Sequence, residues 1–160
     1  MKELEESKQK AAGLLARRRL TEKELYEKLI HFGFSEGTVS DTLHWAREYR
    51  FVDDAEYARM YIADAVNLKK HGRRRIEQAL AYKGVDAFVV QDAFAEMDDN
   101  EYERLLPLVV KKLNGNFERK NVEKAVRSFA AKGYDFGDIR EAVREASLLW
   151  EAQLMNKAEE

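Results

Sequence analysis

The sequence predicts an all-α protein built from three tandem three-helix repeats. Apolar residues recur at helical spacing, and no segment shows the strict alternation of a strand. Gly33, Gly84 and Gly133, which suit helix ends, follow one another at spacings of 51 and 49 residues. A repeat of this period predicts an array in which neighbouring repeats bury each other's apolar faces, with an elongated, curved shape.

Each glycine is flanked by the apolar positions of two successive helices. Positions four and eight before the glycine, and six and ten after it, carry apolar residues in every copy. These are the positions that two amphipathic helices would bury. The set is Leu25, Leu29, Val39 and Leu43, then Ile76, Leu80, Val90 and Phe94, then Ala125, Phe129, Ile139 and Val143.

Residues that favour helix N-caps stand at fixed distances from the same glycines. Thr21, followed by Glu24, also has the spacing of a capping box. Agreement between caps and apolar stripes in all three copies supports the repeat. The caps expected are Thr21, Gly72 and Asn121 twelve positions before each glycine, and Ser35, Asp86 and Asp135 two positions after it.

A further helix is expected before each pair, over residues 4–18, 55–68 and 101–113. Asp53 and Glu56 predict a capping box at the start of the second of these helices. Apolar residues line one face of each helix, so all three would pack onto the pair that follows.

The start of the helix expected over residues 101–113 has several candidate residues. Asp98, Asp99 or Asn100 would cap it, and Pro107 would kink it or mark its true start. Residues 150–160 are expected to form a tail of frayed helix.

The repeat boundaries follow from these elements. We expect the first repeat over residues 1–52, the second over 53–97 and the third over 98–149, followed by the tail at 150–160.

Composition restricts the functional classes. The chain has no cysteine, which excludes disulfides, thiolate chemistry and sulfur-bound metals. The first ten residues are charged and lack the apolar core of a signal peptide, and no apolar run approaches the length of a membrane span. We therefore expect a cytoplasmic protein with no membrane partner. The net charge of −2 neither predicts nor excludes nucleic-acid binding, so the positions of the charges decide.

Two stretches resemble the RecX family of bacterial regulatory proteins. One runs from Phe51-Val52-Asp53-Asp54-Ala55-Glu56-Tyr57-Ala58 through Gly72-Arg73-Arg74-Arg75-Ile76 to Lys83-Gly84-Val85. The other includes Leu14-Leu15, Thr21, Glu24-Leu25, Lys28-Leu29 and Gly33-Phe34. The sequence departs from the family pattern in the polar stretch 67–70 and at Arg73, where the family often has proline.

The resemblance implies a regulator of the RecA recombinase. RecX proteins are three-repeat helical arrays that lie in the groove of the RecA filament on DNA and dampen its ATPase, coprotease and strand-exchange activities. The implied partners are the RecA filament and single- or double-stranded DNA within it, with no cofactor and no small-molecule substrate.

Cations gather at one recurring place, the corner between the first and second helix of each repeat. In a regular array equivalent corners would form one basic ridge, able to contact phosphates or acidic side chains of a protein partner. We add Lys83 to this ridge. The predicted contact residues are Arg17, Arg18, Arg19, Lys69, Lys70, His71, Arg73, Arg74, Arg75, Lys83, Arg119 and Lys120.

A simpler interpretation is that these cations only solvate exposed helix ends, and we favour it for Arg119 and Lys120. It fits Arg73, Arg74 and Arg75 less well, because three cations in the first turn of a helix oppose its dipole. Residues that destabilise their own helix in this way indicate that they are present for a function.

Other functions have weaker support. The third helices of the repeats carry acidic residues and lack a basic base-reading set, which argues against sequence-specific binding in the major groove. The aromatic residues are expected to pack between helices. For Tyr26, Phe34 and Tyr82, near the basic corners, we favour packing, and the alternative is that they are exposed interface anchors. The histidines lack metal-ligand spacing, Asp53-Asp54 and Asp98-Asp99 fit helix caps, and no phosphate loop or activated nucleophile is present, so we expect no enzyme.

The sequence therefore predicts a regulator that binds the RecA–DNA filament and mainly inhibits it. The alternative is a helical DNA-binding module that acts independently of RecA and binds bare DNA with strong salt dependence. A third class, a scaffold or chaperone-like array, would show neither effect.

Overall fold

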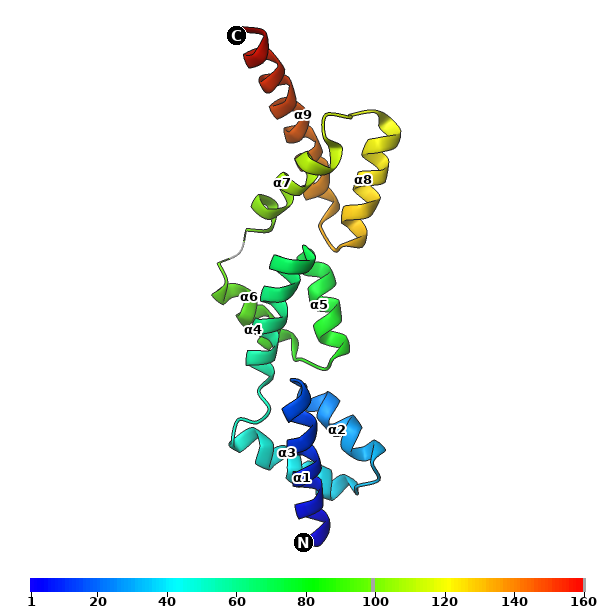
Figure 1. Ribbon diagram of the computed structural model, residues 1–160, viewed down its shortest axis with the longest axis vertical. Helices are drawn as coiled ribbons and strands as arrows, with labels where there is room; N and C mark the ends of the chain where they lie inside the picture. The colour runs from blue at the N-terminus through cyan, green and yellow to red at the C-terminus, as the bar shows by residue number, and fades with distance from the viewer. Residues whose placement is uncertain (99, 160) are drawn as a thin grey trace. The chain divides into compact units, whose positions relative to one another are not determined.

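A computed structural model describes residues 1–98 and 100–159 (Figure 1). The described residues form nine α-helices and one π-helix and contain no strand, which confirms the predicted all-α repeat fold. The elements are α1 (Lys2–Arg17), α2 (Glu22–His31), α3 (Glu36–Glu48), α4 (Asp54–Asp64), the π-helix η1 (Ala65–Lys69), α5 (Arg73–Tyr82), α6 (Ala87–Glu96), α7 (Glu101–Leu113), α8 (Arg119–Ala131) and α9 (Phe136–Glu159).

The chain divides into two compact units. The first consists of Met1–Asp64 and Glu77–Met97, and the second of Ala65–Ile76 and Asp98–Glu160. The middle of the sequence is thus shared, because the π-helix and the start of α5 belong to the second unit. The three repeat boundaries expected from the sequence remain a prediction.

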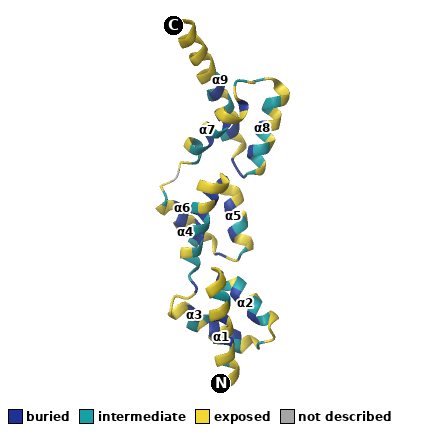
Figure 2. Cartoon of the chain, viewed as in Figure 1, coloured by how far each residue is buried: buried dark blue, intermediate teal, exposed yellow. Residues whose placement is uncertain are grey.

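Each unit contains a core made by the predicted apolar stripes, as the burial colouring in Figure 2 illustrates. In the first unit Leu25, Leu29 and Val39 are completely buried between α1, α2 and α3. In the second unit Phe129 and Ile139 pack in a cluster formed by α7, α8 and α9. Helical spacing located these residues correctly because one face of each helix is excluded from water.

Most predicted helix starts are confirmed. Thr21 forms a complete capping box with Glu24, and the side chains of Ser35 and Asp86 accept hydrogen bonds from first-turn amides of α3 and α6. Asn100 caps α7, while Asp99 lies outside the described residues.

The prediction for Asn121 is wrong. The N-cap of α8 is Glu118, so the helix begins before Asn121. The Asn121 side chain instead donates to the carbonyl of Asn116 at 2.8 Å. In the sequence Asn121 had the polar character of a cap, but its amide is used to close the loop before α8.

Three further elements were considered from the sequence, and two of them differ from expectation. The helix predicted over 55–68 ends as an α-helix at Asp64 and continues as the π-helix Ala65–Lys69. Pro107 lies within α7 and does not mark its start. The tail expected as helix from residue 150 is helical and continues α9 as far as Glu159.

Within the first unit the start of α2 docks on the turn that follows α5, and we call this contact the first junction. The Thr21 hydroxyl donates to the Lys83 carbonyl at 2.6 Å. The backbone amide of Glu22 donates to Oδ1 of Asp54, the first residue of α4, at 2.9 Å. The junction thus satisfies amides and carbonyls that helix ends otherwise leave unpaired.

Replacing Thr21 by valine tests the first junction. Valine has nearly the same shape as threonine but lacks the hydroxyl. The hydrogen bonds that this hydroxyl makes with the Glu24 amide and the Lys83 carbonyl are therefore lost at a fully buried position. We expect a loss of about 2–3 kcal/mol in the free energy of unfolding, measured by urea denaturation. Thr38→Val, which removes exposed hydrogen bonds to Glu3 and Ser35, is the control and should cost less. Equal losses would contradict the role of the junction.

Candidate functional site

The predicted contact residues lie in both units. Arg17–Arg19 and Lys83 belong to the first unit, whereas Lys69–Arg75, Arg119 and Lys120 belong to the second. Each cluster can therefore be described within its own unit, and their alignment in one ridge stays a prediction.

The segment Lys69–Arg75 forms the densest cluster, and its backbone follows a defined path. The π-helix ends at Lys69, and Lys70 has a φ of 58°, a left-handed conformation that reverses the chain. The amide of His71 then donates back to the Ala65 carbonyl at 3.0 Å. This reversal places Gly72 directly before the first turn of α5.

The same segment is fastened to the turn between α8 and α9, and we call this contact the second junction. The Gly72 amide donates to the Lys132 carbonyl at 2.7 Å, and the Arg74 amide donates to the Gly133 carbonyl at 3.3 Å. The buried Tyr134 donates its hydroxyl to the Lys70 carbonyl at 2.7 Å. The main chain is thus held while the basic side chains extend from it.

The second junction repeats the geometry of the first. Gly72 and Thr21 occupy equivalent positions in their repeats, as do the carbonyls of Lys132 and Lys83 that they bond. A carboxylate from the first residue of the next helix but one completes both contacts, and in the first junction it is Asp54 of α4. In the second junction it is Glu101, whose Oε1 accepts from the Arg73 amide at 2.6 Å.

Glu101 explains how α5 tolerates three arginines in its first turn. The carboxylate faces the positive end of the helix dipole and supplies the stabilising charge that the sequence of α5 lacks. Arg104 of α7 also donates to the His71 carbonyl at 3.3 Å. The conflict between charge and dipole is therefore resolved by residues of α7, which the local sequence could not reveal.

The arginine side chains of this segment are exposed. Arg73, Arg74 and Arg75 all face solvent. Arg75 donates weakly to the Ala131 carbonyl at 3.5 Å. Within residues 1–98 and 100–159, no ion pair is formed by Arg74 or Arg75, so their charge is available to an acidic partner or to phosphate.

His71 is half-buried in this cluster, and its surroundings disfavour the imidazolium. Burial lowers the pKa of His71, and the charges of Arg75, Lys69 and Lys132 lower it further. At neutral pH His71 is therefore uncharged, and the positive charge of the site comes from lysine and arginine.

The lowered pKa of His71 predicts a pH effect on stability. Below its ordinary value near 6.5 the unfolded chain takes up a proton that the folded state resists, so stability is full above that pH and declines as the pH falls below it. His71→Gln should make the decline shallower, as measured by thermal unfolding between about pH 7 and 5. The same profile for the variant and the parent would contradict this prediction.

The cations of the first unit surround the end of α1. Arg17 is the last residue of the helix and is exposed. Arg18 and Lys83 both approach Glu24, with N–O distances of 3.9 Å. Glu24 also belongs to the capping box of α2, so part of this positive charge is neutralised within the first junction.

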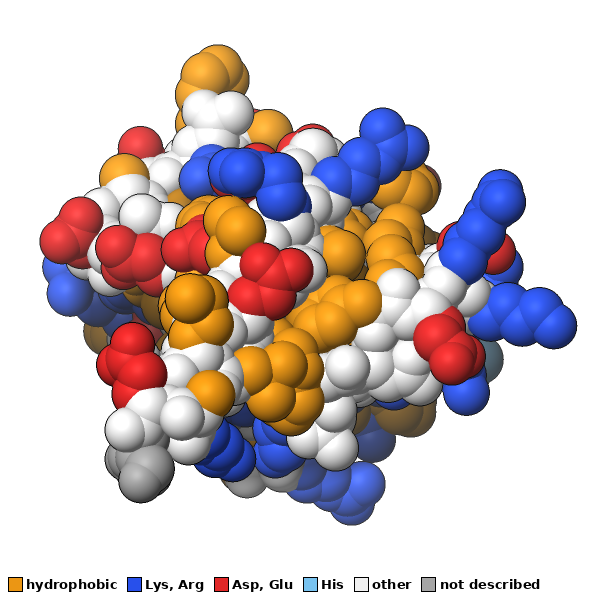
Figure 3. All heavy atoms as spheres, turned by 90° about the horizontal axis from the view of Figure 1, so that it is seen from above, with side chains coloured by type: hydrophobic (Ala, Val, Ile, Leu, Met, Phe, Trp, Pro, Cys, Tyr) orange, Lys and Arg blue, Asp and Glu red, His pale blue; other side chains and the backbone are white. Residues whose placement is uncertain are grey.

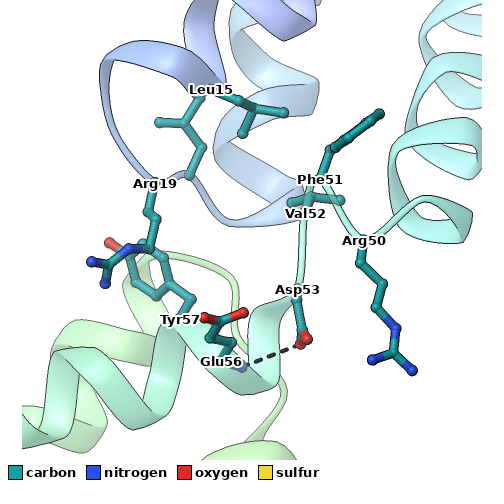
Figure 4. Close-up of a pocket in the computed structure, with 9 residues that line it drawn as sticks. Leu15, Arg19, Arg50, Phe51, Val52, Asp53, Glu56 and Tyr57 are labelled. Atoms are coloured by element: carbon teal, nitrogen blue, oxygen red, sulfur yellow. Dashed lines mark hydrogen bonds between the residues drawn. The ribbon is translucent and has the colours of Figure 1, made fainter.

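Arg19 lines a cavity of about 240 Å³ beside the first junction (Figure 4). Leu15, Phe51 and Tyr57 contribute apolar and aromatic walls. Arg50 also lines it, together with the acidic side chains of Asp53 and Glu56. Asp53 is occupied as a helix cap, accepting from the Glu56 amide at 3.2 Å. The cavity therefore has mixed charge and no single class of ligand that it favours.

Arg119 and Lys120 lie at the start of α8. Arg119 is highly exposed, and its Nε donates to Glu123 at 3.0 Å, one helical turn away. Such an exposed pair contributes little to stability.

In the end-on view of Figure 3, basic and acidic side chains are interspersed on the near face around a central apolar area. Positive charge is thus concentrated in small clusters and does not cover this face.

The prediction for one aromatic residue is wrong. Tyr82 was expected to pack between helices, but it is 85% exposed. Tyr26 and Phe34 are half-buried, as expected for packing. Tyr82 is the last residue of α5 and extends beside Lys23, whose Nζ lies 6.0 Å from the ring centre.

Metal-binding clusters and membrane-spanning helices are both absent from the part of the chain that the structure describes. No group of three or more metal-ligating side chains comes together in residues 1–98 and 100–159. In the same residues, none of the helices has the length and apolar character needed to span a membrane.

Comparison with known proteins identifies the family. Residues 53–93 match the model of the second three-helix domain of RecX. Over 138 residues the chain is 36% identical to the regulatory protein RecX of Vibrio vulnificus, covering 85% of this chain and 90% of that protein. It is 35% identical over 130 residues to the regulatory protein RecX of Clostridium perfringens, covering 78% of this chain and 60% of that longer protein.

Solved structures show the same fold. The crystal structure of RecX from Lactobacillus salivarius superposes with a TM-score of 0.82 at 23% identity, covering 92% of this chain and 98% of that one. A second crystal structure of a regulatory protein RecX gives a TM-score of 0.76. The sequence relatives and the shared fold agree, and the chain belongs to the RecX family of regulatory proteins.

Proposed function

We propose that this protein regulates the RecA recombinase by binding the RecA–DNA filament and dampening its ATPase, coprotease and strand-exchange activities. It would act in the cytoplasm as a binding protein and not as an enzyme. Membership of the RecX family supports the regulatory role. The proposal adds to this role the identity of the partner, RecA, and the inhibitory effect.

The observation that carries this proposal is the fixed presentation of Arg73, Arg74 and Arg75. Four backbone contacts, made by Lys70, Gly72, Arg73 and Arg74, hold the segment, while all three arginine residues are exposed. A rigid main chain lowers the entropic cost of placing cations against a charged partner. Arginine forms paired hydrogen bonds with carboxylates and phosphates alike, so this segment can contact acidic side chains of RecA or the DNA that RecA coats.

The experiment that tests the proposal is the DNA-dependent ATP hydrolysis of RecA, measured with and without substoichiometric amounts of the protein. Loss of hydrolysis, with little binding of the protein to bare DNA, would support a filament regulator. Unchanged hydrolysis together with tight, salt-sensitive binding to DNA would favour the DNA-binding module instead. Neither effect would indicate a scaffold.

A further inference from the structure

The first unit carries an exposed aromatic surface at the end of α3. Trp45, Tyr49 and Phe51 form it, and the Phe51 ring centre lies 5.2 Å from that of Trp45 and 6.0 Å from that of Tyr49. Tyr49 is 65% exposed and Phe51 is 52% exposed. Large aromatic side chains gain stability from burial, so a group of them left in contact with solvent indicates an interaction surface.

The backbone holds these rings in place but does not require them. The Phe51 amide donates to the Ala46 carbonyl at 2.8 Å, which fixes the turn that follows α3. Arg50 in this turn has a φ of 56°, a left-handed conformation that glycine or asparagine adopts more easily. The turn after α6 also has a left-handed residue, Asp98 with a φ of 49°, and a methionine precedes it. The fold thus supports the aromatic residues without needing them.

An apolar hollow of about 430 Å³ lies beside the aromatic surface. Phe51 and Leu15 line it, together with Ala12 and Ala16 on successive turns of α1. The two alanines are small, so they leave a groove along α1 that a ridge of side chains from another helix can enter. No strand, and therefore no sheet edge for an extended peptide, is present in residues 1–98 and 100–159. The hollow is thus suited to a helix.

The cations around this hollow are free to bind a partner. Arg50 lines the hollow, and Arg19 follows the end of α1. Both are exposed, and neither forms an ion pair among the residues that the structure describes. Lys8, also on α1, has its Nζ 5.4 Å from the centre of the Trp45 ring. A helix with acidic side chains beside its apolar ones complements this arrangement.

A single-stranded nucleic acid fits the surface less well. The adjoining cavity of about 240 Å³, drawn in Figure 4, shares Leu15, Arg50 and Phe51 with the apolar hollow. Asp53 and Glu56 also line this cavity. Their carboxylates would repel a backbone that carries a phosphate at every nucleotide, whereas a peptide can place its few acidic residues away from them.

We propose that this surface binds an acidic amphipathic helix of another protein, with a large apolar side chain of that helix in the hollow between α1 and Phe51. Carboxylates of the same helix would pair with Arg50 and Arg19, and further apolar residues would pack on the exposed Tyr49 ring. All of these residues belong to the first unit. The inference is independent of the proposed action on RecA, which is assigned to Lys69–Arg75 in the second unit.

Two synthetic peptides of equal length test the charge of the partner. Both carry leucine at every third or fourth position, and the other positions are glutamate and alanine in one peptide and lysine and alanine in the other. The affinity of the full chain for each labelled peptide is measured by fluorescence anisotropy. We expect the acidic peptide to bind at least about tenfold more tightly. Equal affinities, or no binding of the acidic peptide at millimolar protein, would overturn the proposal.

Substitutions test the place of binding. Arg50→Gln removes the cation, and Ala16→Gln puts a larger polar side chain into the hollow. Each should weaken binding of the acidic peptide about fivefold or more, with helical content unchanged because both positions are exposed. The matched controls are Lys2→Gln in α1 and Ala81→Gln in α5, which make the same changes at other exposed positions of the first unit and should bind normally. Equal effects of the variants and their controls would place the peptide elsewhere and overturn the proposal.

A single-stranded DNA oligonucleotide is the third probe. We expect Arg50→Gln and Ala16→Gln to leave its affinity for the protein unchanged. A greater loss of oligonucleotide binding than of peptide binding in these two variants would assign the surface to nucleic acid, against the proposal.

Discussion

Reversing the charge of Arg73, Arg74 and Arg75 together should raise the concentration of protein needed to inhibit RecA ATP hydrolysis by at least about tenfold. The three residues are exposed, and the contacts of Lys70, Gly72 and Arg74 with the turn between α8 and α9, together with that of the Arg73 amide with Glu101, are made by the main chain. Glutamate at these positions would therefore leave the second junction in place while replacing attraction by repulsion. Acidic residues also suit the start of a helix, so helical content by circular dichroism should be retained.

The matched control reverses Lys124, Arg127 and Arg140, which are exposed and lie outside the predicted contact residues. Both triple variants have the same net charge, so a general electrostatic effect would weaken them equally. A local contact predicts a loss of inhibition in the first variant alone. Undiminished inhibition by Arg73→Glu, Arg74→Glu and Arg75→Glu together would show that the contact lies elsewhere on the molecule.

The fold could be predicted from the sequence because its main determinants are local. The burial of Leu25, Leu29 and Ile76 follows from helical spacing, and the left-handed conformations of Gly33, Gly84 and Gly133 follow from the need to end a helix. The prediction that Asn121 is a helix N-cap failed. A polar residue at the right distance from a glycine is compatible with an N-cap, but it does not determine the residue at which the helix begins.

The candidate site could be predicted only in part. The sequence shows that cations gather at Lys69–Arg75, because this needs no knowledge of neighbours. It does not show that Glu101 and the turn at Lys132–Tyr134 hold this segment, because these partners are separated from it by about thirty to sixty residues. One signal was available: Thr21 and Gly72 stand at matched positions in their repeats, as do Gly84 and Gly133, as expected for a contact that is made twice in the chain.

Substitution of Gly72 by alanine should lower the free energy of unfolding of the second unit by about 1–3 kcal/mol, measured by urea denaturation. A Cβ at Gly72 would lie 2.5 Å from the carbonyl carbon of Gly133 and 2.6 Å from the Tyr134 amide nitrogen. These are backbone atoms that cannot rotate away, so the segment must separate from the turn. Separation would also break the Gly72–Lys132 hydrogen bond.

Three other glycines distinguish this steric effect from general effects of alanine. Gly33→Ala adds the strain of a φ of 94° without a clash and should cost about 1 kcal/mol. Gly133→Ala combines a φ of 98° with a 2.4 Å contact to the Arg75 backbone and should cost the most. Gly13→Ala, inside α1 with open space around it, should stabilise by about 0.5–1 kcal/mol. If Gly72→Ala were as harmless as Gly13→Ala, the basic segment would not be fastened to the α8–α9 turn in solution.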